Sequence, residues 1–96
     1  MEARKIYNRV NVLRKDLGMT RKQFASRLGI SYQTAGYLER EMYNPSLDLA
    51  FRVSELFELP VEMIFSVVPM PAITRQYLQK LMSLKDAQNG SDTRAI

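Results

Sequence analysis

The side chains of this chain that can do chemistry are mostly cations, accompanied by amides, hydroxyls and carboxylates. Fourteen residues are lysine or arginine and ten are aspartate or glutamate, which gives a formal net charge of +4. Cysteine and histidine do not occur in the sequence. Disulfides, thiolate nucleophiles, imidazole bases and the commonest metal ligands are therefore excluded. We expect a protein that is not an enzyme and that uses no metal and no cofactor.

The cations are concentrated in the first half of the sequence. Residues 1–45 hold nine basic and four acidic side chains, a formal charge of +5. Residues 46–96 hold five basic and six acidic side chains, a formal charge of −1. A basic surface of this kind attracts polyanions such as nucleic acid. The alternative from charge alone is a solvated basic face that keeps the protein soluble.

Two short helices are predicted within this basic half. Thr20, followed three residues later by Gln23, forms a capping-box pattern that predicts a helix beginning after Thr20. This helix stops at Gly29, which favours a positive φ, and a three-residue connection leads to a second helix over about 32–40. Such a pair is typical of a helix-turn-helix, whose second helix projects from the domain. The alternative is a helical hairpin that only packs.

The second helix of the pair has an inward and an open side. Ala35 and Leu38 are spaced to face inward. The amide of Gln33 can pair bidentately with adenine N6 and N7, worth about 1–3 kcal/mol of discrimination. Glycine inside a helix costs about 0.5–1 kcal/mol against alanine, so Gly36 either permits close approach to a ligand or has no role. The open side is predicted to carry Tyr32, Gln33, Gly36 and Tyr37.

Apolar residues at helical spacing predict further helices around this pair. One covers about residues 7–17, one starts at residue 47 after the cap Ser46, and a short one covers 61–65. The predicted inward residues are Val10, Leu13, Arg14 and Leu17, then Leu47, Ala50, Val53, Leu56 and Phe57, then Ile64 and Phe65.

The sequence changes character after Phe65. Residues 66–68 favour a short strand, and a helix is predicted over about 72–87, followed by a polar tail. We therefore divide the chain into a helical domain, 1–69, and a C-terminal helix with a tail, 70–96. Neither a signal peptide nor a membrane span is visible, so we expect a cytoplasmic protein.

Spaced motifs from about Ile6 to Phe65 resemble the Cro/C1-type (XRE-like) helix-turn-helix family of small phage and bacterial transcriptional repressors. The resemblance implies an all-α, five-helix lambda-repressor-like DNA-binding domain. It also allows a short ribbon of about residues 4–7 with 66–68. The matching motifs are Leu17-Gly18-Met19-Thr20, Phe24-Ala25, Leu28-Gly29-Ile30-Ser31, Gln33-Thr34, Leu38-Glu39 and Asn44-Pro45-Ser46-Leu47.

The resemblance implies that helix 32–40 lies in the major groove of DNA. Arg21 stands where the family usually has glutamine, and Glu41 replaces a common glycine. Arg14 and Glu39 occupy the positions of a structural ion pair. The implied base-reading residues are Ser31, Tyr32, Gln33, Gly36 and Tyr37. The implied phosphate-contacting residues are Thr20, Arg21, Lys22, Arg40 and Asn44.

The resemblance further implies a homodimeric repressor on a palindromic operator, with double-stranded DNA as partner. Either the ribbon or the helix over 72–87 is the candidate dimer interface. The candidate interface residues are Tyr7, Val67, Val68, Ile73, Tyr77, Leu81 and Leu84.

Two alternatives to a repressor stay open. The chain could be the antitoxin of a toxin–antitoxin pair, with the C-terminal helix binding a partner protein, or a protein-interaction module without DNA binding. Only 27 residues follow Pro69, too few for a separate ligand-binding domain, so we expect no small-molecule effector.

Overall fold

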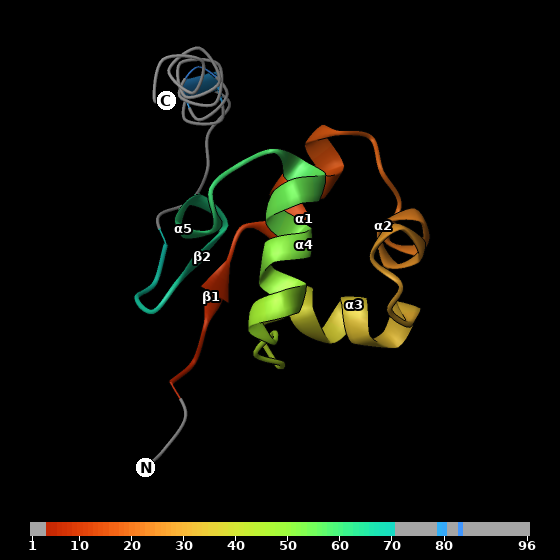
Figure 1. Cartoon of the computed structure of the whole chain (residues 1–96), viewed down its shortest axis with the longest axis horizontal. Helices are drawn as coiled ribbons and strands as arrows, with labels where there is room; N and C mark the ends of the chain where they lie inside the picture. Colours follow the sequence, from red (N-terminus) through yellow and green to blue (C-terminus); the bar gives the residue numbers. More distant parts are fainter. Residues whose placement is uncertain (1–3, 71–78, 81–82, 84–96) are drawn as a thin grey trace.

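The computed structural model describes residues 4–70, 79–80 and 83. Five helices and one two-stranded ribbon are found within residues 4–70, which confirms the predicted all-α fold with a short ribbon. In Figure 1, α2 and α3 lie on one side of α4, and α5 and the ribbon lie on the other. The elements are β1 (Tyr7–Asn8), α1 (Val10–Asp16), α2 (Arg21–Leu28), α3 (Tyr32–Glu39), α4 (Leu47–Phe57), α5 (Val61–Ile64) and β2 (Phe65–Ser66).

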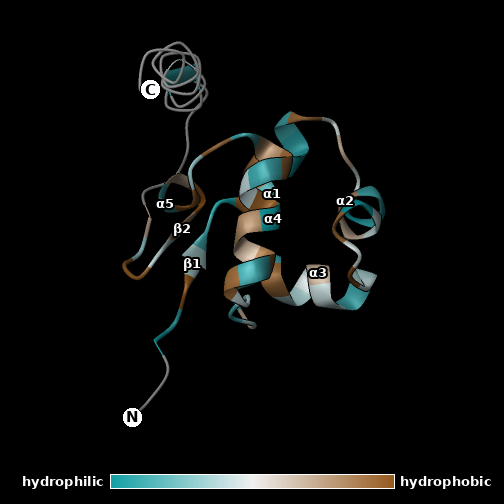
Figure 2. Ribbon diagram, in the orientation of Figure 1, coloured by the Kyte–Doolittle hydropathy of each residue, from teal (hydrophilic) through white to brown (hydrophobic). Residues whose placement is uncertain are grey.

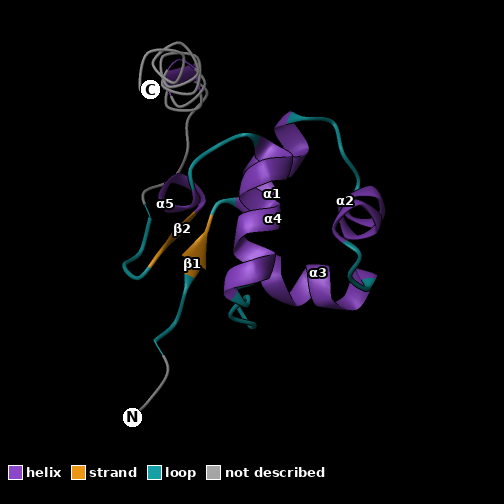
Figure 3. Ribbon diagram, in the orientation of Figure 1, coloured by secondary structure: helices purple, strands orange, loops and turns teal. Residues whose placement is uncertain are grey.

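Local signals determine how α2 and α3 begin and end. The Thr20 hydroxyl accepts a hydrogen bond from the Gln23 amide, and the Gln23 side chain accepts one from the Thr20 amide, so the predicted capping box is present. Gly29 ends α2 at φ +69°, the left-handed conformation that the turn requires. Ser31 then caps α3 by accepting from the Thr34 amide. The two helices meet at a steep angle in Figure 3.

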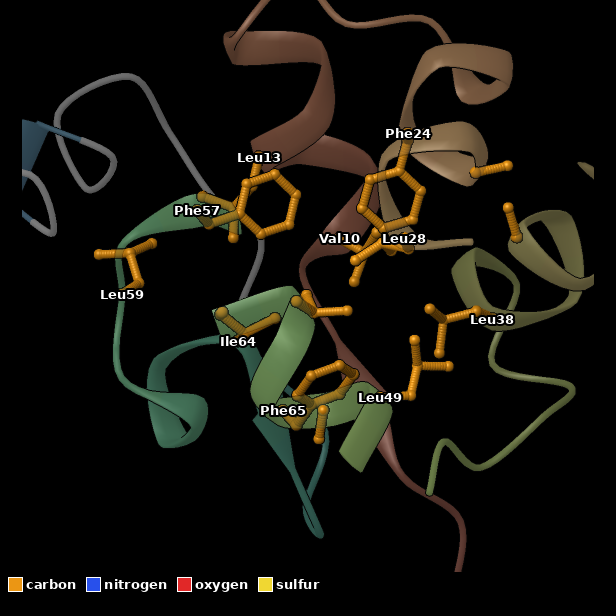
Figure 4. Close-up of a cluster of buried hydrophobic side chains, with 14 residues drawn as sticks. Val10, Leu13, Phe24, Leu28, Leu38, Leu49, Phe57, Leu59, Ile64 and Phe65 are labelled. Atoms are coloured by element: carbon orange, nitrogen blue, oxygen red, sulfur yellow. The ribbon is translucent and has the colours of Figure 1, made fainter. Parts of the chain in front are cut away.

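A single apolar cluster joins the helices to the ribbon. The rings of Phe24 and Phe57 stack with their centroids 5.8 Å apart. Figure 4 shows side chains from α1, α2, α3, α4 and the ribbon converging on this cluster, and Figure 2 shows hydrophilic and hydrophobic stretches along the same helices. The six largest fully buried side chains are Phe24, Leu13, Leu38, Ile64, Val10 and Val53.

The ribbon differs from its predicted position by one or two residues. Tyr7 pairs with Ser66 and Asn8 pairs with Phe65, in antiparallel register, rather than residues 4–7 with 66–68. Because Tyr7 and Asn8 belong to a strand, α1 begins at Val10 and not at residue 7. The Asn8 side chain accepts a hydrogen bond from the Val10 amide where the strand meets the helix.

Three predicted orientations were wrong. Leu17 and Leu47 are exposed, because each lies at a helix end where the chain leaves the core, and Leu49 is buried in place of Leu47. Gly36 is buried and not open, because two arginine side chains cover it. One helix boundary also differs from the prediction. The short fifth helix, predicted over 61–65, ends at Ile64, because Phe65 begins β2.

Several predicted features lie outside the described residues. Of the predicted C-terminal helix, the structure describes Gln79, Lys80 and Ser83, which are helical. The candidate interface residues Ile73, Tyr77, Leu81 and Leu84 are not among the described ones.

Candidate nucleic-acid interface

The outer face of α3 carries three long polar side chains. Tyr32 and Tyr37 keep 58% and 39% of their surface exposed, and Gln33 between them is exposed. We call Tyr32, Gln33 and Tyr37 the α3 outer face. The structure thus brings together three of the five residues that were predicted to read bases. Two phenol hydroxyls and one amide offer donors and acceptors that can meet base edges in a groove.

The other two predicted base-reading residues have different surroundings. The Ser31 hydroxyl accepts from the Thr34 amide at 3.0 Å and donates to the Thr34 hydroxyl at 2.9 Å, so it serves the start of α3. Gly36 lies beneath the guanidinium groups of Arg21 and Arg40, which stand between its backbone and any ligand.

Two arginines extend over the α3 outer face. Arg21 begins α2, and its guanidinium carbon lies 5.5 Å from the centre of the Tyr32 ring. Arg40 follows α3, and its guanidinium carbon lies 5.5 Å from the centre of the Tyr37 ring. A cation over an aromatic ring at such an exposed site contributes about 0.5–1 kcal/mol. Each stack therefore restricts one cation and one phenol together.

The remaining candidate phosphate contacts surround this face. Lys22 is exposed, and the Thr20 hydroxyl takes part in the capping box. The Asn44 amide is used elsewhere: its Nδ2 donates to the Arg4 carbonyl at 2.7 Å, and its Oδ1 accepts from the Ile6 amide at 3.2 Å. Asn44 therefore holds the N-terminal segment against the loop that follows α3.

Arg14 and Glu39 form a buried ion pair behind the face. Arg14 Nε lies 2.9 Å from Glu39 Oε2, and Arg14 Nη2 donates to Oε1 at 3.1 Å. Asn11 adds a third hydrogen bond to this carboxylate at 2.8 Å, and Arg21 Nε lies 3.6 Å from it. Burial raises the pKa of Glu39, but hydrogen bonds from Arg14 and Asn11 and the charges of Arg14 and Arg21 outweigh burial. The pKa of Glu39 therefore lies below its ordinary value, and the carboxylate stays ionised.

Glu41 fixes the chain just after α3. Its φ is +61°, the left-handed conformation that a glycine adopts without strain. Its carboxylate accepts a hydrogen bond from the Asn8 amide at 2.9 Å and lies 3.7 Å from Lys5 Nζ. The Asn8 side chain donates to the Leu38 carbonyl at 2.8 Å, at the end of α3. The Glu41 carboxylate therefore points toward β1 and the segment that precedes it.

Sequence reasoning missed Asn8 and Asn11, which support α3 from α1 and β1. Their partners lie about thirty residues away in the chain, and no local pattern marks them. Of the candidate interface residues, Tyr7 is half-buried in the ribbon, whereas Val67 and Val68 are exposed just beyond it.

An all-helical domain with a capped pair of helices and a polar outer helix face defines a helix-turn-helix protein. Residues 12–64 match the helix-turn-helix family, more than half of the chain. The protein therefore belongs to this family, and its likeness to the Cro/C1-type members is confirmed. The family consists of DNA-binding transcription regulators, which makes DNA-binding regulation the class of this protein.

The chain is similar to several curated regulators. It is 37% identical over 57 residues to an HTH-type transcriptional regulator of Archaeoglobus fulgidus, covering 59% of this chain and 80% of that protein. It is 36% identical to one from Methanocaldococcus jannaschii, covering 60% and 88%, respectively. It is 31% identical to the HTH-type transcriptional regulator YgzD of Bacillus subtilis, with the same shares covered.

Neither a membrane-spanning helix nor a metal-binding acidic cluster is found among the described residues. Within the described ranges, no helix has the length and apolar character needed to cross a bilayer. Among the same residues, no three acidic side chains come together in a way that could hold a metal ion.

Proposed function

We propose that this protein is a homodimeric repressor that binds a palindromic operator in double-stranded DNA, with α3 in the major groove. The observation that carries the proposal is the α3 outer face, where Tyr32, Gln33 and Tyr37 are exposed together on a capped helix whose inner side is buried. A cytoplasmic location, on DNA, belongs to the same proposal.

Within the groove, Gln33 is proposed to read a base and the flanking cations to contact phosphates. An exposed amide on a helix can pair bidentately with adenine, which is worth about 1–3 kcal/mol against a wrong base. Ser31, Tyr32 and Tyr37 complete the proposed base-reading set, whereas Gly36, which was predicted to belong to it, is covered by Arg21 and Arg40 and is not assigned to a base. The proposed phosphate contacts, which position the protein without reading sequence, are Thr20, Arg21, Lys22, Arg40 and Asn44.

The homodimer is proposed because one module makes few base contacts. A two-fold pair would present two α3 helices to half-sites about 10 bp apart, centre to centre. Val67 and Val68, which lie in a bend directly after β2 and are exposed, support the ribbon as one interface, since exposed apolar residues beside a sheet edge favour contact with a second copy.

Selection of bound sites from a random duplex pool, at near-physiological salt, tests the proposal. We expect an enriched inverted repeat with half-sites about one helical turn apart. Recovery of no motif by a folded protein would overturn sequence-specific binding. A single half-site bound with one chain per duplex would overturn the dimer alone.

The role of Gln33 has a separate test with a matched control. Gln33→Ala should relax preference at one base pair of the selected site by about 5- to 150-fold, the equivalent of about 1–3 kcal/mol. Gln79→Ala removes the same amide from an exposed helical position outside the α3 outer face and should leave the preference unchanged. An equal loss of Gln33→Ala affinity on all sequences would contradict base reading.

A further inference from the structure

Gly36 lies at the point where two guanidinium groups converge. A Cβ added at this position would lie 3.4 Å from Nη1 of Arg21, 3.4 Å from Nη1 of Arg40 and 3.7 Å from Nη2 of Arg40. Because the Nη1 nitrogens of Arg21 and Arg40 each lie 3.4 Å from the same point, the distance between them is at most twice 3.4 Å. A side chain longer than alanine would occupy the space that the two groups now share, so glycine allows them to approach the helix backbone together.

The two like charges are not equally compensated. Nε of Arg21 lies 3.6 Å from the Glu39 carboxylate, which already accepts hydrogen bonds from Arg14 and Asn11. The described contact of Arg40 is the ring of Tyr37, which carries no net charge at neutral pH. Around Gly36 the positive charges of the arginines therefore exceed the negative charge of Glu39, and an added anion would lower their mutual repulsion.

Arg21 is also held with its Nη1 nitrogen close to Gly36. Its Nε is buried without a hydrogen bond in the described structure, and it faces Glu39 beyond hydrogen-bonding distance. Its guanidinium carbon also lies over the Tyr32 ring, 5.5 Å from the ring centre. The Nη1 group of Arg21 therefore lies beside Gly36, next to the Nη groups of Arg40.

We propose that Arg21 and Arg40 act as one clamp that binds a single backbone phosphate of duplex DNA above Gly36. The proposal rests on the proposed DNA-binding function and deepens it, because it assigns two cations, one at the start of α2 and one just after α3, to a single phosphate. Nitrogens this close can both donate to the oxygens of one phosphate, since each charge-assisted N–H···O bond is about 2.7–2.9 Å long.

A phosphate suits this site better than the base edge of a guanine does. Arginine also donates to guanine O6 and N7, and either acceptor would accept from Nη groups. Guanine is neutral, however, and would leave the repulsion between the two arginines in place. A phosphate carries the charge that the site lacks, so we assign the backbone and not a base edge to the clamp.

The test uses the full chain and the duplex recovered by selection, with one phosphate at a time replaced by a neutral methylphosphonate. We expect wild-type binding to weaken about tenfold or more at the clamp phosphate, as the loss of charge-assisted hydrogen bonds requires. Arg21→Ala and Arg40→Ala should each abolish that sensitivity at the same position. Arg27→Ala, an equal charge change at an exposed residue of α2, should leave it intact.

Salt dependence supplies an independent count of phosphates. Each phosphate neutralised contributes about 0.9 to the slope of log K against log salt on duplex DNA. The double variant Arg21→Ala/Arg40→Ala should therefore lose about 0.9 of slope, and not about 1.8 as two separate phosphates would require. Gly36→Leu, which fills the shared space while keeping both cations, should lose the clamp sensitivity as well. Thermal melts verify that each variant is folded.

Three results would overturn the clamp. The two alanine variants could lose their sensitivity to methylphosphonate at two different phosphates. The slope for the double variant could fall by about 1.8. Binding could also weaken when 7-deazaguanine replaces a guanine and not when a methylphosphonate replaces a phosphate. All three leave DNA binding itself intact. A wild-type protein that binds no duplex would overturn the clamp and the proposed function together, so the two failures are distinguishable.

Discussion

Replacing Glu39 by glutamine tests how much of the fold depends on the ion pair behind α3. Glu39 accepts three hydrogen bonds, two from Arg14 and one from Asn11, with its side chain 2% exposed. Each hydrogen bond to a charged group contributes about 1.5–3 kcal/mol, which dehydration of the buried charges partly offsets. Removing one partner of a buried pair leaves the other uncompensated, at a cost of about 3–5 kcal/mol. A domain stable by about 5–15 kcal/mol would lose a large share of that.

Urea unfolding followed by circular dichroism, repeated from pH 7 to pH 3, measures this loss. The fold lowers the pKa of Glu39, so the folded protein binds this proton more weakly than the unfolded chain does. The contribution of the carboxylate is therefore complete above the ordinary glutamate pKa of about 4.3 and declines as the pH falls through the lowered pKa. Glutamine has no such titration. The difference in stability between wild type and Glu39→Gln should shrink in acid.

An exposed glutamate of α4 and a double replacement of the ion pair provide two controls for Glu39→Gln. Glu55→Gln makes the same change at an exposed residue of α4 and should alter stability by no more than about 0.5 kcal/mol. Replacing Arg14 and Glu39 together by methionine should cost less than Glu39→Gln, because no charge is left unpaired. A loss below about 1 kcal/mol, or a difference equally large at pH 7 and pH 3, would refute the reasoning.

Three further changes test the local signals of the fold. Ser46→Ala removes the hydroxyl that accepts from the Leu49 amide at 3.1 Å and should cost about 1 kcal/mol in a thermal melt; an unchanged melt would remove Ser46 as a cap. Gly29→Ala forces a side chain onto a φ of +69° after α2 and should cost about 1 kcal/mol in urea unfolding; an unchanged stability would mean that the turn does not need the left-handed conformation. Leu38→Ala empties a fully buried position and should cost about 2–5 kcal/mol in the same assay; a cost under about 1 kcal/mol would mean that the core closes over the gap.

Features that depend on neighbours in sequence were predictable. The capping box at Thr20, the left-handed Gly29 and the cap at Ser31 each act within four residues, and the structure contains all three. The inward residues Ala35 and Leu38 also follow from helical period alone, and both are fully buried. These local rules are enough to locate α2 and α3, and with them the α3 outer face.

Features that depend on distant partners were not predictable. Helical period accommodates Leu47 as well as Leu49, and only packing against other helices determines that Leu49 is the buried one. Helical period alone predicts that Gly36 is open. In the structure it is covered, because the arginine that begins α2, fifteen residues earlier, reaches over it. The family pattern indicated that Glu41 stands in place of a glycine, but the direction of its carboxylate depends on Asn8 in a separate strand.

The attachment of β1 to the loop after α3 has a consequence for the order in which the protein is made. Strand β1 leaves the ribosome before its partner β2, which begins at residue 65, and its hydrogen bonds to Glu41 and Leu38 span at least thirty residues. Contacts of such sequence separation form late, because a long loop must close first. A nascent chain that already contains α2 and α3 therefore lacks the ribbon that braces the end of α3. Full support of that helix is reached only when translation has passed the last strand.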